Sequence, residues 1–275
     1  KRYTDANITP ATTPEEWVDV SKALTNRDQQ QYGFYSPHLI NEASDFWFTL
    51  QQWCMPYNGV WAEGKTPKLT SEPIIKGLSL FKQMYDDAMP QGADIETGKR
   101  LFGTGAVAQE LIVSAAVGGL KPDFPDLYPE LRSAPIPWES NTSLARIHPM
   151  MVNASSPVKD AAVEFVKYMY VPDNYRRMVE GCEDVIFAIP SAAYLEKLHW
   201  LKPGYYGVKY VTPFDIVGDF LYNFSEFGQI VITNFADVLN ANKPVEEAMA
   251  AAQAQAEQLA GRIEHPDRQV AGLPR

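Results

Sequence analysis

The residues that come closest to a catalytic motif form the segment 59–66, Gly-Val-Trp-Ala-Glu-Gly-Lys-Thr, which fits the phosphate-loop pattern GxxxxGK(S/T). That pattern cradles a phosphate only where a buried strand precedes it and a helix starts at its lysine. Here Pro56 interrupts the preceding segment. Pro67 directly follows Thr66, where it is poorly compatible with a helix that starts at Lys65. We therefore predict an exposed loop that binds no nucleotide.

No other motif supports nucleophilic, nucleotide or metal chemistry. The patterns GxSxG, GxGxxG and HExxH are absent. The nearest approach to the dinucleotide pattern, at 103–108, runs from an expected helix into an expected strand, which is the reverse of the required order. The four histidines and two cysteines show no ligand spacing, so we predict no metal and no other cofactor.

Two chemical possibilities stay open from the residue types alone. Cys54 and Cys182 read as small buried hydrophobic residues, although a disulfide between them is not excluded by the sequence. The 34 Asp and Glu residues could supply a carboxylate pair for glycoside hydrolysis. The spacing that matters for such a pair is spatial, and solvated surface acids are the simpler interpretation.

Composition limits the class of protein. The chain has 275 residues, enough for one large or two medium domains, and a formal net charge of -10. That charge argues against nucleic acid as a partner, because phosphate binding needs clustered Lys and Arg. No apolar run is long enough to span a bilayer, and no apolar stretch of a signal peptide follows Lys1.

Aromatic residues suggest a different kind of site. Five of them gather in the first half of the chain, namely Trp47, Trp53, Tyr57, Trp61 and Trp138. Sugar-binding sites place aromatic faces against the C–H faces of the ring, whereas a single Trp is more often a core residue. The core interpretation is weakest for Trp138, because its segment 134–139 is too rich in proline to be an expected core element. We therefore predict that it stacks on a ligand.

The hydrophobic periodicity predicts the elements that must position these residues. Helices are expected at 13–24, 44–53, 71–85, 94–102, 156–170, 172–180, 218–239 and 244–261, and strands at 31–35, 107–113 and 147–152. Residues 118–143, rich in Pro, Gly and Asp, read as a loop. Helices and strands mix without a regular βαβ repeat, which favours an α/β protein with an incomplete or interrupted sheet.

Three blocks at 102–108, 149–169 and 243–249 resemble, in this order, the back half of the bacterial extracellular solute-binding proteins of the maltose-binding type. Phe102-x-x-Gly-x-Val-Ala108 resembles the family's F-x-x-G-x-x-A-M, with Gln109 where Met is usual. The segment 181–191, ending in Pro-Ser, and the segment 3–17 resemble further parts of the family pattern.

The resemblance implies an α/β fold of the periplasmic-binding-protein-like, two-lobe type II, with the first lobe incomplete. Residues 13–146 with 200–262 would form the C-terminal lobe. Residues 1–12 with 147–199 would be the remnant of the N-terminal lobe, and 263–275 a tail. An incomplete first lobe would bind its solute weakly or not at all. It would leave the face of the helix at 157–170 either exposed, which favours association, or covered by another chain.

The implied function is the substrate-binding component of an ABC importer, which holds a sugar or similar small polar solute between two lobes and delivers it to membrane permease subunits. The implied location is periplasmic or extracytoplasmic, and no catalysis is expected. The alternatives are a carbohydrate-active hydrolase that uses a carboxylate pair, and a cytosolic interaction domain.

By position in the family, ligand contacts are implied after the strand 31–35, at the start of the aromatic helix, after the strand 107–113 and near residue 225. Ser114 and its neighbours stand where a stacking Trp is often found, so that Trp138 would take over that role. The resulting set is Tyr35, Ser36, Asp45, Trp47, Ser114, Trp138, Phe224 and Phe227.

Overall fold

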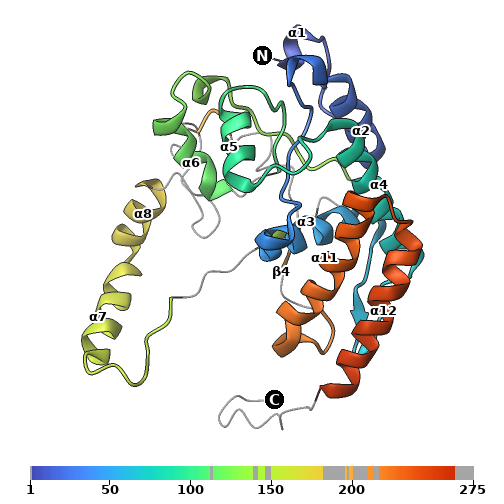
Figure 1. Cartoon of the computed structure of the whole chain (residues 1–275). Coiled ribbons are helices and arrows are strands. Elements are labelled where there is room, and N and C mark those ends of the chain that lie inside the picture. Colours follow the sequence, from blue (N-terminus) through green and yellow to red (C-terminus); the bar gives the residue numbers. More distant parts are fainter. Residues whose placement is uncertain are drawn as a thin grey trace. The chain divides into compact units, whose positions relative to one another are not determined.

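The computed structural model of the chain describes residues 2–111, 114–138, 142–145, 150–181, 196, 198–200, 210–213 and 217–263. Helices dominate these residues (Figure 1). Their contacts separate two compact units, one of residues 1–36 and 86–213 and the other of residues 37–85 and 214–275. The boundaries of these two units differ from the lobe boundaries expected from the sequence. The lobe boundaries stay a prediction.

The first unit contains short pieces of strand among helices. Its elements are α1 (Arg2–Asp5), α2 (Pro14–Ala23), η1 (Arg27–Gln29), α5 (Ile95–Gly103), α6 (Ser114–Asp123), η4 (Tyr128–Glu130), β3 (Thr142–Ala145), α7 (Lys159–Met169), α8 (Pro172–Gly181) and β4 (Tyr210–Pro213). Strands β3 and β4 pair in parallel. The second unit contains η2 (Ile40–Glu42), α3 (Ala43–Cys54), η3 (Met55–Tyr57), β1 (Ala62–Glu63), β2 (Thr66–Pro67), α4 (Glu72–Ala88), η5 (Leu221–Asn223), α11 (Phe224–Ala241) and α12 (Val245–Arg262), and the last residues of α4 are grouped with the first unit.

Helix α2 begins as the sequence predicts. The Thr13 hydroxyl accepts a hydrogen bond from the Glu16 amide at 3.1 Å, and the Glu16 carboxylate accepts one from the Thr13 amide at 3.3 Å. This capping box satisfies amides that a helix start leaves without partners, and Pro14 has no amide hydrogen to satisfy. The helix then buries Trp17 and Ser21, which pack against Phe34 and Gly33 of the segment 31–35.

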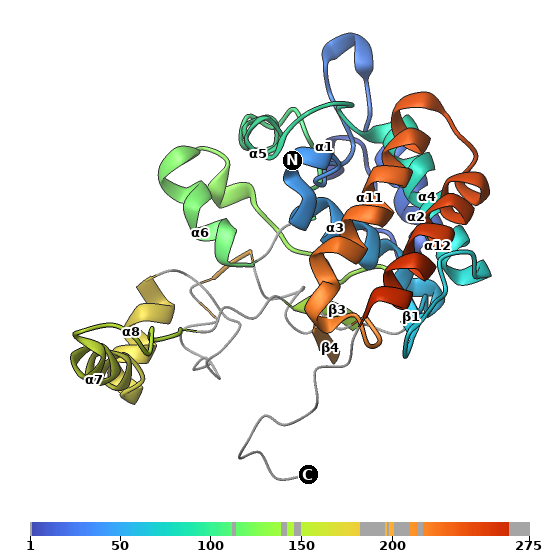
Figure 2. The same cartoon turned by 60° about the horizontal axis from the view of Figure 1, so that its bottom comes forward.

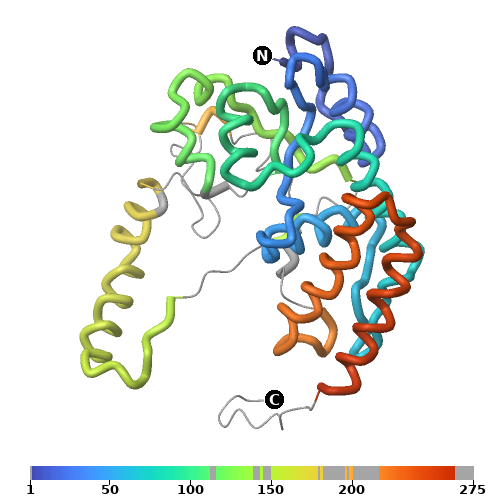
Figure 3. The backbone as a smooth tube through the Cα atoms, viewed as in Figure 1, coloured from blue at the N-terminus to red at the C-terminus, as the bar shows by residue number. Residues whose placement is uncertain are grey.

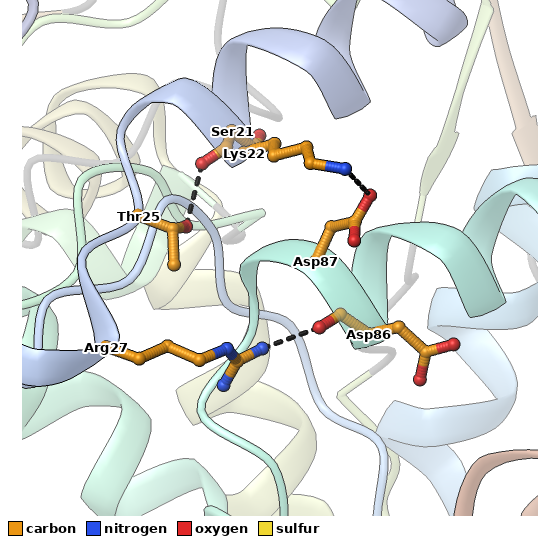
Figure 4. A network of polar contacts seen from close by, with 6 residues as sticks. All are labelled: Ser21, Lys22, Thr25, Arg27, Asp86 and Asp87. Atoms are coloured by element: carbon orange, nitrogen blue, oxygen red, sulfur yellow. Dashed lines mark hydrogen bonds and ion pairs between the residues drawn. The ribbon is translucent and has the colours of Figure 1, made fainter.

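Polar contacts tie the end of α2 to the end of α4 (Figure 4). Lys22 Nζ donates to Asp87 at 3.1 Å, and the Arg27 guanidinium donates to the carbonyl of Asp86 at 2.6 Å. The Thr25 hydroxyl donates to the Ser21 carbonyl at 2.8 Å. The Lys22–Asp87 pair is exposed and contributes only about 0–1 kcal/mol, so it orients the helix ends more than it stabilises them.

The second unit is built around three helices. Helix α11 packs against both α3 and α12, and the three lie side by side in two views (Figures 1 and 2). Phe235 on α11 lies between Phe46 of α3, with ring centroids 6.3 Å apart, and Phe81 of α4, at 6.1 Å. All three rings are fully buried, so this contact belongs to the unit's hydrophobic core.

The phosphate-loop-like segment is a β-hairpin. Strands β1 and β2 pair antiparallel, with Ala62 opposite Pro67, and Gly64 adopts a positive φ of 56° in the turn, where glycine costs no strain. Lys65 Nζ donates to the carbonyl of Ile263 at 2.7 Å. No helix starts at Lys65, as expected from Pro67, but the expectation of an exposed loop is wrong in part, because Trp61 and Ala62 are buried.

Other expected elements need correction. The expected loop at 118–143 contains α6 and η4, because Val117 and Leu120 pack into a cluster with Leu131, and tertiary packing outweighs the poor helix propensity of Gly118 and Gly119. The expected helix at 218–239 starts only at Phe224. Residues 150–152 form no strand, and residues 147–149 lie outside the described part of the chain.

Helix α7 exposes its apolar face. It begins at Lys159, slightly later than expected, and it contains no buried residue. Val158 is 64% exposed and Phe165 is 57% exposed. Figure 3 follows the backbone from α7 into α8, and the stacked rings of Tyr170 and Tyr175, 5.5 Å apart, connect the two helices. Apolar side chains gathered on one exposed helix face favour association with another surface.

We expect this face to make the chain self-associate. Replacing its most hydrophobic exposed residue in Phe165→Ser should reduce association without loss of stability, since little of that ring is buried. Sedimentation velocity at several concentrations measures the effect. Tyr222→Ser, which changes a 77% exposed side chain elsewhere, is the matched control. A concentration-independent monomer for the unmodified chain would contradict the prediction.

Candidate ligand-binding site

In the first unit, the segments 32–35 and 107–110 run parallel to each other. Isolated bridges join Tyr32 to Val107 and Tyr35 to Glu110. The Tyr35 amide donates to the Gln109 carbonyl at 2.9 Å, and the Leu111 amide donates to the Tyr35 carbonyl at 3.2 Å. Because the two segments are parallel, their carboxyl ends meet at one edge. In α/β proteins the carboxyl edge of parallel strands is where ligands bind.

Gln109 holds this edge against α2. Its side-chain carbonyl accepts a hydrogen bond from the Trp17 indole at 2.7 Å, and its amide donates to the Ser21 hydroxyl at 2.9 Å and to the Gly33 carbonyl at 3.2 Å. A methionine, which is usual at this position in the resembled family, could replace none of these bonds. The change from the family pattern is therefore compensated by a connected polar network.

The side chain of the next residue, Glu110, lies on the face opposite to that of Gln109. Successive side chains of an extended segment alternate between faces, so Glu110 lies opposite the face on which Gln109 meets α2. Its Oε2 atom is enclosed and has no hydrogen-bond partner among the described residues. Burial raises the pKa of Glu110 from 4.5 to about 7, and the positive charge of Lys99 on α5 lowers it only in part.

This pKa shift predicts how stability depends on pH. A carboxyl whose pKa is higher in the folded than in the unfolded chain binds its proton more tightly when folded. Glu110 therefore destabilises the fold as the pH rises from about 4.5 through 7, and the penalty is fully present above that range. Urea unfolding at several pH values should show a flatter profile in Glu110→Gln than in the unmodified chain. Parallel profiles for the two proteins would contradict the assignment.

Tyr35 and Ser36 stand at the same edge as Glu110, and both are buried. The Tyr35 ring packs on α5 at Gly98, where an added Cβ would come within 2.5 Å of Tyr35 Cδ1. A glycine is needed at this position for the ring to approach the helix so closely. The structure thus brings together Tyr35, Ser36 and Glu110 in the first unit.

In the second unit the structure brings together Trp47, Phe224 and Phe227. The Trp47 ring centroid lies 6.3 Å from that of Phe224 and 6.1 Å from that of Phe227. Trp61 packs on Trp47 from 4.6 Å in an edge-on arrangement. Trp47 and Phe227 are buried, whereas Phe224 is only half-buried and flanks them. Phe224 is thus the member of this aromatic cluster that retains an accessible face.

The remaining predicted residues lie elsewhere. Asp45, half-buried, stands on α3 near Trp47, and Ser114 is the first residue of α6. Trp138 is only 4% exposed and lies 6.2 Å from Trp17 between ring centroids. The premise that its proline-rich segment cannot enter a core is wrong, because an irregular segment can bury a side chain whose ring packs against a helix.

Sequence reasoning missed Glu110. The available signal was its place at the end of an expected strand, two residues after the Ala of the family-like block at 102–108. A carboxylate at the carboxyl end of a strand is a candidate ligand group in its own right. The parallel pairing with Tyr35, which makes that position informative, is visible only in the structure.

A shallow hollow of about 290 Å³ lies beside α2 and is lined by residues 9–12 together with Glu16, Asp19 and Val20. The Glu16 carboxylate already accepts hydrogen bonds from the amide and hydroxyl of Thr12 at 2.9 and 2.6 Å. These bonds and the bond from the Thr13 amide lower the pKa of Glu16. The hollow is explained by helix capping and is not a candidate ligand site.

The described residues contain few groups that could support metal or thiol chemistry. In that part of the chain no group of three or more His, Cys, Asp or Glu side chains could hold a metal ion. Cys54 is a buried free thiol whose pKa is raised by burial, which makes it a poor nucleophile. Cys182 lies outside the described residues. Among the described helices, none has the length and apolar character needed to cross a bilayer.

Solved structures share this fold. An ABC transporter solute-binding protein from Agrobacterium radiobacter K84, in complex with ribitol, is 20% identical with a TM-score of 0.74, over 94% of this chain and 67% of that chain. The maltose-bound MalE3 of T. maritima is 15% identical with a TM-score of 0.75, over 94% and 68%.

An ABC transporter solute-binding protein from Thermotoga lettingae TMO, bound with alpha-D-tagatose, is 14% identical with a TM-score of 0.73, over 94% of this chain and 68% of that chain. These similarities confirm the predicted α/β fold of the periplasmic-binding-protein-like type. No curated protein matches the chain. A family model described as "Bacterial extracellular solute-binding protein" matches residues 1–176. Since this match covers more than half of the chain, the chain belongs to the family of bacterial extracellular solute-binding proteins.

Proposed function

We propose that this protein is the substrate-binding component of an ABC importer and that it binds a sugar, a polyol or a similar small polar solute without transforming it. The observation that carries the proposal is the family match over residues 1–176. The ligand class is supported by the similar structures, which hold ribitol, alpha-D-tagatose and maltose. The partners in this proposal are the membrane permease subunits, and the location is periplasmic or extracytoplasmic.

The candidate contacts fit such a ligand chemically. The edge at Tyr35, Ser36 and Glu110 offers polar groups that can bond hydroxyls, and the aromatic cluster in the second unit offers ring faces for C–H groups. Asp45 and Ser114 complete the proposed set with further polar side chains. Polar groups for hydroxyls and an aromatic face for C–H groups are the two kinds of contact that sugar recognition uses.

A thermal-shift titration of the chain with ribitol, D-tagatose and maltose tests the proposal, with L-lysine as a chemically unrelated control. A ligand present at 100 times its Kd stabilises the folded state by about 2.7 kcal/mol. That corresponds to an increase in Tm of about 5 °C or more for a chain of this size. An unchanged Tm with every sugar and polyol, up to high millimolar concentration, would contradict the ligand class.

The hydrolase considered from the sequence receives no support from the comparisons, which return solute-binding proteins. Incubation with maltose followed by chromatography separates the two functions. We expect all of the sugar to be recovered intact. Release of glucose at a rate above that of a buffer blank would favour hydrolysis instead.

Trp138 remains in the proposed set as a stacking residue. Trp138→Ala should weaken binding of the best ligand from the titration by about 1 kcal/mol or more, the usual contribution of an aromatic contact. Isothermal calorimetry measures the Kd, and circular dichroism shows whether the variant is folded, because the side chain is also buried beside Trp17. An unchanged Kd in a folded variant would remove Trp138 from the site.

A further inference from the structure

Glu110 has an enclosed acceptor atom without a partner, and that needs a physical explanation. Most buried polar side-chain atoms in proteins have a hydrogen-bond partner, and an exception points to a ligand, an ion or a water. Glu110 Oε2 is enclosed, yet no described residue donates to it. The residue as a whole is only partly buried, so the side chain is not sealed inside a core.

None of the ion pairs between residues that the structure describes includes Glu110. The basic residue that acts on it most is Lys99, but Lys99 Nζ is bonded to Asp123 at 3.1 Å. The burial that raises the pKa of Glu110 to about 7 measures how poorly the carboxylate is solvated. A carboxylate in this state gains most from a ligand that brings hydrogen-bond donors and no negative charge.

The position of Glu110 fits ligand contact and not core packing. It pairs with Tyr35 across parallel segments, at the carboxyl edge where Ser36 follows. The network of Gln109 with Trp17 and Ser21 fixes the backbone of this segment. Since neighbouring side chains alternate, that network also fixes the face on which Glu110 projects.

We propose that the Glu110 carboxylate contacts the solute directly, accepts hydrogen bonds from its hydroxyl groups, and thereby selects neutral sugars and polyols over the corresponding sugar acids. The inference rests on the proposed function and adds to it a specificity-determining residue. An acidic sugar brings a second negative charge to an already poorly solvated carboxylate, which disfavours binding.

Isothermal calorimetry with ribitol and D-ribonate at pH 7.5 tests the inference on three proteins: the unmodified chain, Glu110→Gln and Glu96→Gln. Glu96 is exposed on α5, and its replacement makes the same change in net charge. We expect Glu110→Gln to bind ribitol about tenfold or more weakly, as for loss of a charged hydrogen bond. The ratio of ribitol to ribonate affinity should fall in the same variant, and Glu96→Gln should retain both values.

The outcomes separate this inference from the function on which it rests. If the unmodified chain binds neither ribitol nor any sugar of the thermal-shift panel, the proposed ligand class and this inference both fail. If it binds ribitol, and Glu110→Gln binds ribitol and ribonate with the same affinities, only the inference fails. Misfolding does not explain a loss of affinity, because removing the buried charge should leave the fold as stable or more stable, which the Tm verifies.

Discussion

Gly33→Ala is expected to reduce the free energy of unfolding by more than about 3 kcal/mol, which lies above the usual range for overpacking. A Cβ on Gly33 would overlap the carbonyl group of Ser21 and come within 2.7 Å of its Cα. All of these atoms belong to the backbone of α2, so no side chain can rotate away. The Gly33 amide also donates to Thr25 Oγ1 at 2.9 Å and to the Ala88 carbonyl at 3.1 Å, which prevents an easy shift of the strand.

Urea unfolding followed by circular dichroism measures this effect, and the Tm should fall by about 6 °C or more. Gly261→Ala is the matched control, since it changes a glycine of α12 around which no atom lies within 4 Å of the added Cβ. That control should leave stability unchanged or increase it by up to about 1 kcal/mol, because Ala is the better helix former. Equal stability of Gly33→Ala and the unmodified chain would show that α2 and the segment 31–35 are not packed this closely.

The close approach at Gly33 also explains why the candidate edge forms. The glycine lets the segment 31–35 lie directly on α2, which places Gln109 within bonding distance of Trp17 and Ser21. A displaced segment would lose the bonds of Gln109 and the pairing of Tyr35 with Glu110. A change at Gly33 should therefore weaken ligand binding as well as stability.

Local signals made much of the fold predictable. The capping box of Thr13 and Glu16 predicts the start of α2. The periodic apolar residues of α4 and α12 predict these helices without any knowledge of contacts distant in sequence. Strands were predicted at 31–35 and 107–113, but in the described residues these segments form only isolated bridges, Tyr32 to Val107 and Tyr35 to Glu110. The parallel pairing between the two segments was not predicted.

The failures share a physical cause. Helix α6 is stabilised by contacts of Val117 and Leu120 with Leu198 and Trp200, which are distant in sequence. Local helix propensity does not depend on such distant contacts and therefore could not predict them. Trp138 was expected to be accessible because prolines surround it, yet Trp17 provides a buried surface for its ring. In both cases a long-range contact decides the outcome, and single-sequence patterns do not register such contacts.

The candidate site was predictable in part for the same reason. Trp47, Phe224 and Phe227 were identified from family positions, and the structure brings them together. Glu110 was missed, because only the pairing with Tyr35 and the enclosure of its Oε2 atom distinguish it from other acidic residues. The pKa and the hydrogen bonds of a carboxylate depend on its surroundings in the fold, and the amino-acid composition gives no information about those surroundings.

Trp47→Ala is expected to cost about 3–5 kcal/mol of stability, the range for removal of a buried aromatic ring. The Trp47 ring is 2% exposed and contacts Trp61 and both phenylalanines of the aromatic cluster. It also lies against the backbone of α11, where a Cβ on Gly228 would come within 2.8 Å of Trp47 Cδ1. Removing the ring thus leaves a cavity between α3 and α11, and the surrounding helices can fill it only in part.

Phe224→Ala distinguishes the structural role of the cluster from its proposed role in binding. Phe224 is half-buried at the start of α11, so its removal should cost less stability than removal of Trp47. If its accessible face stacks on the solute, the same change should weaken ligand binding by about 0.5–1.5 kcal/mol. Urea unfolding and calorimetry on both variants measure the two quantities separately. A Phe224→Ala variant with unchanged Kd, beside a Trp47→Ala variant with reduced stability, would assign the whole cluster to the core.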